Sequence, residues 1–258
     1  MKEDDSQRGN LWLRTRLGKI TASEISCLMK DRKEPMTEEE LAEWKAANPK
    51  SRVTTKTVPF SDASFTYLNR KVMENYLPLS YSTDEEKNVV DEYIEEHSFT
   101  NRAMSWGVLW EDTARKRYSE VMGYEVLEVG FVPYDKYPKL MGVSPDGLTR
   151  EENGGCEIKC PYTMEKHLQH LLYETPQDIK ENDEAYYWQM YACMLVTDRD
   201  FWDFVSFNPY VSRSKQLKIL RVNRDENEIK ALRERIDLAV DYIREKMQEL
   251  DNIQTIIK

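Results

Sequence analysis

Apolar residues recur along the chain with two spacings, one typical of helices and one typical of strands. Residues of Asn101–Met122 show helical spacing, and Gly123 supplies a C-terminal cap. Caps and prolines mark further helices, which we expect at Ala22–Met29, Thr37–Asn48, Asp62–Tyr76, Asp84–His97, Met164–Leu172, Glu184–Val196 and from about Glu226. Strands are expected at Tyr124–Phe131, Lys139–Val143, Cys156–Cys160, Phe201–Phe207 and Gln216–Val222. The pattern predicts an α/β fold with a central sheet flanked by helices.

The chain shows no division into repeats or linker-separated parts. No period of about 20–50 residues recurs, and no Gly/Ser-rich or Pro-rich linker interrupts the sequence. We therefore expect one domain over 1–258, with a helical insertion at about 35–98 and a C-terminal helix from about 226. The helix at Ala22 is expected to begin in a capping box formed by Thr21 and Glu24.

Composition indicates a packed protein of the cell interior. Hydrophobic residues make up 40% and charged residues 33% of 258 residues, and no apolar run approaches the roughly 18 residues that span a bilayer. We expect a cytoplasmic protein without a membrane partner. The four cysteines lack paired Cys-x-x-Cys spacing, so reduced thiols are expected, without a disulfide or a zinc knuckle, at Cys27, Cys156, Cys160 and Cys193.

The net charge of −10 at first argues against a nucleic-acid partner, because Lys and Arg must neutralise phosphates. The distribution of charge changes this picture. Acidic residues concentrate in Thr37–Asn48, Asp84–His97 and Asp225–Asp251, whereas residues 12–19 carry three basic side chains and no carboxylate. An acidic outer shell around a basic groove would be compatible with DNA binding.

The segments Ser144–Gly147 and Cys156–Cys160 carry the most informative chemistry. Side chains alternate along a strand, so Glu157 and Lys159 should share one face while the apolar positions between them pack on the other. A short hairpin through Asn153-Gly-Gly would bring Asp146 beside Glu157. Two such carboxylates can hold Mg²⁺, which would polarise a scissile phosphate and activate water, and Lys159 could orient the attacking hydroxide or offset developing charge.

The spacing of Asp146, Glu157 and Lys159 could also arise by chance, because 47 of 258 residues are acidic. An apolar strand flanked by Gly-Gly and Pro favours a site instead. With these residues in hand, the chain resembles the phage lambda exonuclease family, the YqaJ-type viral recombinases, within the restriction-endonuclease-like nucleases. Blocks in matching order over about 12–222 carry the resemblance: Arg14–Ser23, Trp106–Arg115, Ser144–Gly147, Glu157–Pro161 and Tyr186–Gln189.

The resemblance implies a 5′→3′ exonuclease on double-stranded DNA that releases mononucleotides and leaves a 3′ single strand for recombination by annealing. It implies one or two Mg²⁺ ions, with Mn²⁺ able to substitute, and a lambda-exonuclease-type mixed sheet. By position, Lys159 would be the catalytic lysine and Gln189 would orient water or the lysine. The implied metal ligands are Asp146, Glu157, the backbone carbonyl of Ile158, and Glu111.

The resemblance also implies a pocket for the terminal 5′ phosphate. Its residues would be Arg16, Thr21 and Ser23, because a helix N-terminus attracts anions and Arg binds phosphate bidentately. For this pocket, the alternative is an ordinary capped helix on the surface. For Glu111, the alternative is an i,i+4 ion pair with Arg115 on a solvated helix face. The family further implies a homotrimeric ring, an annealing-protein partner, and a phage or prophage origin in a bacterial host. The acidic stretch from about 35 to 97 looks longer than in the lambda enzyme.

Several alternatives stay open at this point. His167 and His170 could share a metal ion, although two polar positions on an exposed helix face are the commoner explanation. Tyr186, Tyr187 and Trp188 could stack on unpaired bases, but at helical spacing most of this cluster is expected to pack in the core. An endonuclease or repair nuclease on the same sheet is one rival function, and a non-catalytic DNA-end-binding scaffold is another.

Overall fold

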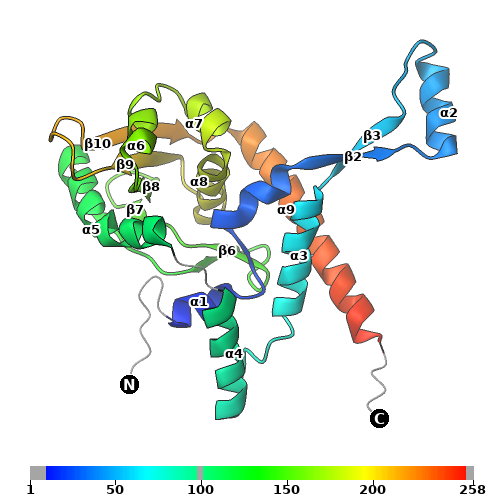
Figure 1. Cartoon of the computed structure of the whole chain (residues 1–258), viewed down its shortest axis with the longest axis horizontal. Helices are drawn as coiled ribbons and strands as arrows, with labels where there is room; N and C mark the ends of the chain where they lie inside the picture. Colours follow the sequence, from blue (N-terminus) through cyan, green and yellow to red (C-terminus); the bar gives the residue numbers. More distant parts are fainter. Residues whose placement is uncertain (1–9, 98–100, 254–258) are drawn as a thin grey trace.

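A five-stranded mixed sheet forms the centre of the protein. The computed structural model describes residues 10–97 and 101–253. The strand order is β10-β9-β8-β7-β4, with only β8 and β9 parallel. The strands are β4 (Val126–Leu127), β7 (Gly147–Thr149), β8 (Gly154–Lys159), β9 (Phe201–Phe207) and β10 (Leu217–Asn223). The strand predicted around Glu157 therefore lies in the middle of the sheet (Figure 1).

Helices cover both faces of this sheet. On one face, α5 (Arg102–Met122) packs Ala114 and Tyr118 against Cys156 and Ile158 of β8. On the other lies α8 (Glu184–Thr197), which contacts β8 and β9 and joins the larger apolar core with α9 (Glu226–Asp251). The predicted mixed sheet flanked by helices is confirmed.

The helix α8 is buried around most of its circumference. Tyr187 and Trp188 are 6% and 4% exposed and belong to the core, together with Met190 and Met194. A helix that is apolar on all sides is expected to lie inside the protein. The interpretation of these aromatics as core residues is confirmed, with Tyr186 only half-buried beside the cleft described below.

The Gly-Gly pair after Asn153 belongs to β8 as well as to the predicted turn. A Cβ at Gly154 would lie 2.0 Å from the ring of Phe201, and one at Gly155 would lie 2.4 Å from the ring of Trp202. These residues are register partners on the parallel neighbour β9. Glycine is thus required because aromatic rings of β9 lie over the backbone of β8.

Four more of the predicted helices appear, one with the predicted bounds and three with small changes. They are α2 (Glu38–Ala47), α3 (Asp62–Glu74), α4 (Asp84–His97) and α6 (Met164–Leu171). The predicted helix at Ala22–Met29 is a 3-10 helix, η1, and its expected capping box is absent. The hydroxyl of Thr21 contacts Glu24 Oε2 at 3.5 Å, and its backbone N–H donates to Tyr67 OH at 3.2 Å. Tertiary contact with α3 has replaced the local cap.

The strand expected at Tyr124–Phe131 is wrong over most of its length. Only β4 remains in the central sheet, and the chain then crosses to a three-stranded sheet of β1 (Ile20–Thr21), β6 (Met141–Val143) and β5 (Val132–Pro133). The predicted strand at Lys139–Val143 is shortened to β6. Two short helices were not predicted, α1 (Asn10–Arg16) and α7 (Pro176–Asn182), although Thr175-Pro-Gln-Asp178 is a capping signal for α7.

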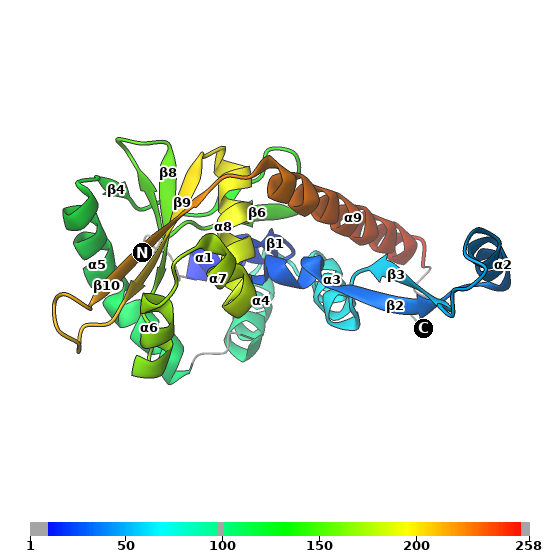
Figure 2. The same cartoon turned by 90° about the horizontal axis from the view of Figure 1, so that it is seen from above.

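A hairpin arm projects from the body at one end. Strand β2 (Asp31–Pro35) pairs with β3 (Thr55–Pro59), and α2 lies at the tip (Figure 2). None of the residues of α2 is buried. The segment 35–98, expected to be helical, therefore also contains a strand. That strand is β3, and its highly charged partner β2, which precedes the segment, lacks the apolar alternation by which a strand is predicted.

Candidate active site

Asp146 lies in the turn that leads directly into β7. Because β7 pairs antiparallel with β8, with Gly147 opposite Cys156, the carboxylate comes close to the middle of β8. Its Oδ2 accepts a hydrogen bond from the backbone N–H of Ile158 at 2.7 Å. The hairpin expected to bring Asp146 beside Glu157 is present, and the aspartate is 9% exposed.

Glu157 and Lys159 project from the face of β8 opposite to Cys156 and Ile158, as strand alternation predicts. Glu157 is fully buried, and Lys159 Nζ lies 2.6 Å from its Oε1. The same ammonium lies 3.5 Å from Oε1 of Gln189 on α8 and 4.4 Å from the centre of the Tyr186 ring. Four of the predicted site residues, Asp146, Glu157, Lys159 and Gln189, thus lie together between β8 and α8.

The charge of Lys159 is stabilised by its surroundings. Burial by itself would lower the pKa of Lys159, but the attraction of Glu157, and then of Asp146, outweighs it and raises that pKa above the ordinary value. Lys159 therefore stays protonated in this arrangement. A protonated Lys159 can stabilise negative charge on a substrate.

Glu111 lies on α5 at the edge of the same region. Its Oε1 accepts from Arg115 Nη2 at 2.9 Å, and Arg115 Nε donates to the backbone carbonyl of Asp146 at 3.0 Å. The alternative of an i,i+4 pair is therefore present, but not on a solvated face, since the two side chains are only 12% and 9% exposed. Arg115 fixes the loop that carries Asp146 against α5.

The oxygen donors at β8 fit a hard divalent cation by their chemistry. Asp146, Glu157 and Lys159 together carry a net charge of −1, which a cation would compensate, and carboxylate and carbonyl oxygens suit Mg²⁺. Within residues 10–97 and 101–253, no group of three or more His, Cys, Asp or Glu side chains is arranged to hold a metal.

Arg16, Thr21 and Ser23 form a second polar cluster at the start of η1. Arg16 Nη2 donates to Ser23 Oγ at 2.8 Å, and the hydroxyls of Ser23 and Thr21 are 3.5 Å apart. The guanidinium lies over the ring of Trp12, with 4.3 Å between Cζ and the ring centre. The three residues that were predicted to bind a phosphate are thus brought together.

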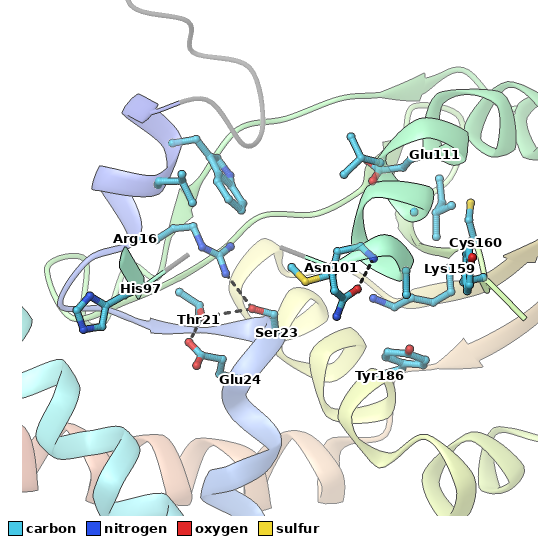
Figure 3. Close-up of a pocket in the computed structure, with 18 of the residues that line it drawn as sticks. Arg16, Thr21, Ser23, Glu24, His97, Asn101, Glu111, Lys159, Cys160 and Tyr186 are labelled. Carbon is cyan, nitrogen blue, oxygen red and sulfur yellow. Dashed lines mark hydrogen bonds between the residues drawn. The ribbon is translucent and has the colours of Figure 1, made fainter. Parts of the chain in front are cut away.

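A cleft of about 920 Å³ connects the two clusters. Figure 3 shows Arg16, Thr21 and Ser23 on one side and Lys159 and Glu111 on the other. Five basic side chains and three carboxylates line it, giving +2 in a chain of net charge −10; they are Arg16, Arg70, Lys71, Lys159, Lys166, Glu24, Glu74 and Glu111. Asp146 and Glu157, which are not part of the lining, would bring this sum to zero. The more deeply buried Asp146 and Glu157 lie behind the lining.

His167 and His170 are buried, so the interpretation of an exposed helix face is wrong. Each is 1% exposed, and both place Nδ1 within 3.0 Å of Ser206 Oγ on β9. Nε2 of His167 faces the carbonyl of Lys215, and Nε2 of His170 faces Asp183 at 3.1 Å, so both Nε2 atoms must carry hydrogens. Ser206 can donate its hydroxyl hydrogen to only one of the two Nδ1 atoms at a time. These histidines hold α6 against the sheet.

The architecture defines the class of protein. An alkaline exonuclease from Laribacter hongkongensis shares it with a TM-score of 0.64 and 23% identity, over 93% of this chain and 95% of that one. A second structure of that enzyme was determined in complex with dAMP. A phage-related exonuclease from Haemophilus somnus 129PT matches with a TM-score of 0.58 and 15% identity, over 90% and 96%. The chain therefore shares the fold of these exonucleases.

The family follows from the sequence match. Residues 11–200 match the model of the YqaJ-like viral recombinase domain, and the chain belongs to this family. The resemblance identified from the sequence blocks is confirmed. No curated protein matches the chain. Family and fold together support a nuclease. Among the described residues, no helix is both long and apolar enough to cross a membrane.

Proposed function

We propose that this protein is a Mg²⁺-dependent exonuclease that degrades double-stranded DNA in the 5′→3′ direction. It would release 5′-mononucleotides and leave a 3′ single strand for recombination by annealing. The observation that carries the proposal is one cleft with Lys159 and its carboxylates at one side and Arg16 with Ser23 at the other. The dAMP complex of the Laribacter enzyme supports a mononucleotide product.

The metal would be held by Asp146 and Glu157, with the carbonyl of Ile158 as a further oxygen donor. When bound, Mg²⁺ would polarise the scissile phosphate and lower the pKa of a bound water. Mn²⁺ offers the same preference for oxygen ligands and should substitute. Glu111 would assist at the metal from α5, where Arg115 holds its carboxylate at the cleft wall.

Lys159 would stabilise the negative charge that grows on the phosphate during hydrolysis. As an ammonium in contact with Glu157, it would offset that charge or orient the attacking hydroxide. Gln189 and the ring of Tyr186 would hold the ammonium at the cleft. On the opposite wall, Arg16 with the hydroxyls of Ser23 and Thr21 would bind the terminal 5′ phosphate through charge-assisted hydrogen bonds.

One assay tests this proposal against its rivals. Linear and covalently closed circular duplexes of the same sequence are incubated with Mg²⁺ or with EDTA, and the products are resolved. We expect mononucleotides from the linear duplex in Mg²⁺ alone, faster from 5′-phosphorylated than from 5′-hydroxyl ends. Nicking of the closed circle would support an endonuclease instead. Binding of ends without any hydrolysis would support a scaffold.

The assembly and the partner belong to the same proposal. We propose a homotrimeric ring, because a closed ring around DNA would keep the enzyme on its product strand, and a single-strand annealing protein as partner in the bacterial cytoplasm. Sedimentation equilibrium would test the ring, with a mass of three chains expected. A mass of one chain at micromolar concentration would contradict it.

A further inference from the structure

Four aromatic rings gather beside the cleft and are not used by the proposed chemistry. We call Trp106, Trp110, Tyr162 and Tyr210 the aromatic platform. The ring of Trp106 lies at its centre, with centroid distances of 5.6 Å to Trp110, 5.9 Å to Tyr162 and 5.3 Å to Tyr210. The rings come from α5, from the segment after β8 and from the loop between β9 and β10. No single stretch of sequence therefore reveals the platform.

The backbone carbonyl of Pro161 ties these three segments together. It accepts from Trp106 Nε1 at 3.1 Å and from Nδ2 of Asn208 at 3.4 Å. Asn208 is 1% exposed, and its Oδ1 accepts from the backbone N–H of Tyr210 at 3.0 Å. A buried asparagine thus fixes Tyr210 relative to the end of the active-site strand, so the platform has a defined geometry.

The platform is accessible, unlike the aromatic residues of α8. Tyr210 is 67% and Tyr162 is 49% exposed, and the neighbouring Leu109 is 67% exposed. Exposed apolar side chains that lie together mark interaction surfaces more often than isolated ones do. Packing inside the protein therefore does not account for these two rings.

The platform continues directly from the proposed catalytic site. Tyr162 follows Lys159 by three residues, so their Cα atoms are at most about 11 Å apart. Beside the platform is a hollow of about 580 Å³ that shares Asn101 and Tyr162 with the main cleft. A chain of nucleotides in the cleft would reach the rings without leaving the protein surface.

The charge around the platform suits a polyanion. Arg102 lines the hollow and Lys166 lines the adjacent cleft. The loop 208–216, which carries Tyr210, also contains Arg213 and Lys215 and has no carboxylate. Aromatic rings combined with basic side chains are the combination by which proteins bind single-stranded nucleic acids, because every base offers a π-face.

We propose that the aromatic platform stacks against unpaired bases of the DNA end next to the catalytic site. This inference rests on the proposed function, since it takes the cleft as the path of the DNA. Bases inside a duplex are already stacked on each other, so the rings select nucleotides whose pairing has opened. The platform would therefore hold the end of the duplex open during successive rounds of hydrolysis.

The test compares two hairpin duplexes that have one open end each. Both carry three unpaired nucleotides on each strand at that end, and in the second hairpin these six positions are abasic, which keeps the phosphates and removes the bases. A fluorophore in the closed loop reports binding by anisotropy, with EDTA present. The wild-type chain should bind the hairpin with bases about fivefold to thirtyfold more tightly than the abasic one.

Variants of the full chain test whether the aromatic rings cause this ratio of affinities between the hairpin with bases and the abasic hairpin. Tyr210→Leu and Tyr162→Leu keep apolar bulk and should bring the ratio towards one, whereas Tyr210→Phe keeps the ring and should preserve it. Trp44→Leu is the matched control, because Trp44 is an aromatic residue, 39% exposed, on the distant arm. It should leave the ratio unchanged.

A wild-type ratio near one overturns the proposal, whether or not any variant folds. An unchanged ratio in Tyr210→Leu and Tyr162→Leu overturns it too, and a change of oligomeric state in these variants would assign the platform to contact between copies of the chain. If linear duplex is degraded in Mg²⁺ but the ratio is near one, only this inference fails. If the ratio is as expected but no mononucleotide is released, the exonuclease proposal fails and the binding site stands.

Discussion

The two walls of the cleft differ in where they keep their charges. On the wall built from β8, α5 and α8, the carboxylates of Asp146 and Glu157 are 9% and 0% exposed, and Lys159 forms an ion pair with Glu157. On the wall built from α1, β1 and η1, Arg16 and Ser23 line the cleft and bond to each other. Buried charges, such as those on the first wall, interact strongly with a reacting group because little water screens them. A side chain that binds the end of a DNA strand, as proposed for Arg16 on the second wall, must instead be accessible from the cleft.

The walls also differ in how they are held. The wall built from β8, α5 and α8, which we call the catalytic wall after its proposed role, depends on sheet pairing from β7 through β8 to β9. The other wall depends on side chains of α3: Glu74 Oε2 accepts from the backbone N–H of Gly18 at 2.9 Å, and Asn75 Nδ2 donates to the Gly18 carbonyl at 2.9 Å. Gly18 has φ of 70°, which favours glycine. Changes on the two walls should therefore have separable effects.

The largest expected effect is on the catalytic wall. Glu157→Gln and Lys159→Ala should each lower the rate of hydrolysis by about 10²–10³-fold or more, because each removes a charge that acts on the reacting phosphate. Duplex binding should stay within about threefold of wild type, since other groups position the DNA. Single-turnover digestion and filter binding measure the two quantities. A variant that cleaves at the wild-type rate would contradict the assignment of that residue.

The next effect concerns the opposite wall. Arg16→Ala should slow digestion of 5′-phosphorylated ends by about tenfold to a hundredfold, the loss expected for charge-assisted hydrogen bonds, and should spare 5′-hydroxyl ends. Arg16→Lys is the control, because it keeps the charge but not the two-pronged geometry, and it should fall in between. Equal slowing on 5′-phosphorylated and 5′-hydroxyl ends would contradict the proposed phosphate pocket.

A third variant tests the rigidity of the catalytic wall. Gly155→Ala should lower the free energy of unfolding by about 1–3 kcal/mol, because its Cβ would overlap the ring of Trp202. Gly130→Ala is the matched control, since a Cβ there meets nothing within 4 Å, and it should change stability by less than about 0.5 kcal/mol. Urea denaturation gives both values. Equal loss in the two variants would refute the close-approach argument.

The smallest effect is a pH dependence behind the catalytic wall. Burial, together with nearby His170, lowers the pKa of His167 against the opposing hydrogen bond to Lys215. As pH falls below about 6.5, His167 binds a proton in the unfolded chain but not in the folded chain. The free energy of unfolding therefore falls by at most about 1.4 kcal/mol per pH unit. His167→Gln should reduce this slope between pH 6.5 and 5 in urea titrations. An unchanged slope would show that other groups cause it.

A second pH window lies lower. Burial opposes the ionised form of Asp183, but hydrogen bonds from His170, Lys166 and Tyr173 lower its pKa below the ordinary value. Its contribution to stability is therefore present at neutral pH and is lost as pH falls below about 4 towards the folded-state pKa. Asp183→Asn should remove that contribution and flatten the acid side of the stability curve.

Prediction from sequence succeeded where the contacts are local. Asp146 and Glu157 are joined by one short hairpin, and alternation along β8 separates Lys159 from Ile158 without any knowledge of the remaining chain. It failed where long-range packing decides the outcome. The buried faces of His167 and His170 look like solvent-facing positions in the sequence, and Ser206 on a distant strand makes their burial possible.

The sequence by itself determined the family, the α/β class, the strand that carries Glu157 and Lys159, and the turn that supplies Asp146, because short-range periodicity and turn chemistry encode these features. Only the tertiary structure decided that Arg16 shares a cleft with Lys159, that Arg115 fixes Glu111 at its wall, and that aromatic rings from separate segments meet at Pro161. Such contacts form when the whole core closes, and no local pattern records them.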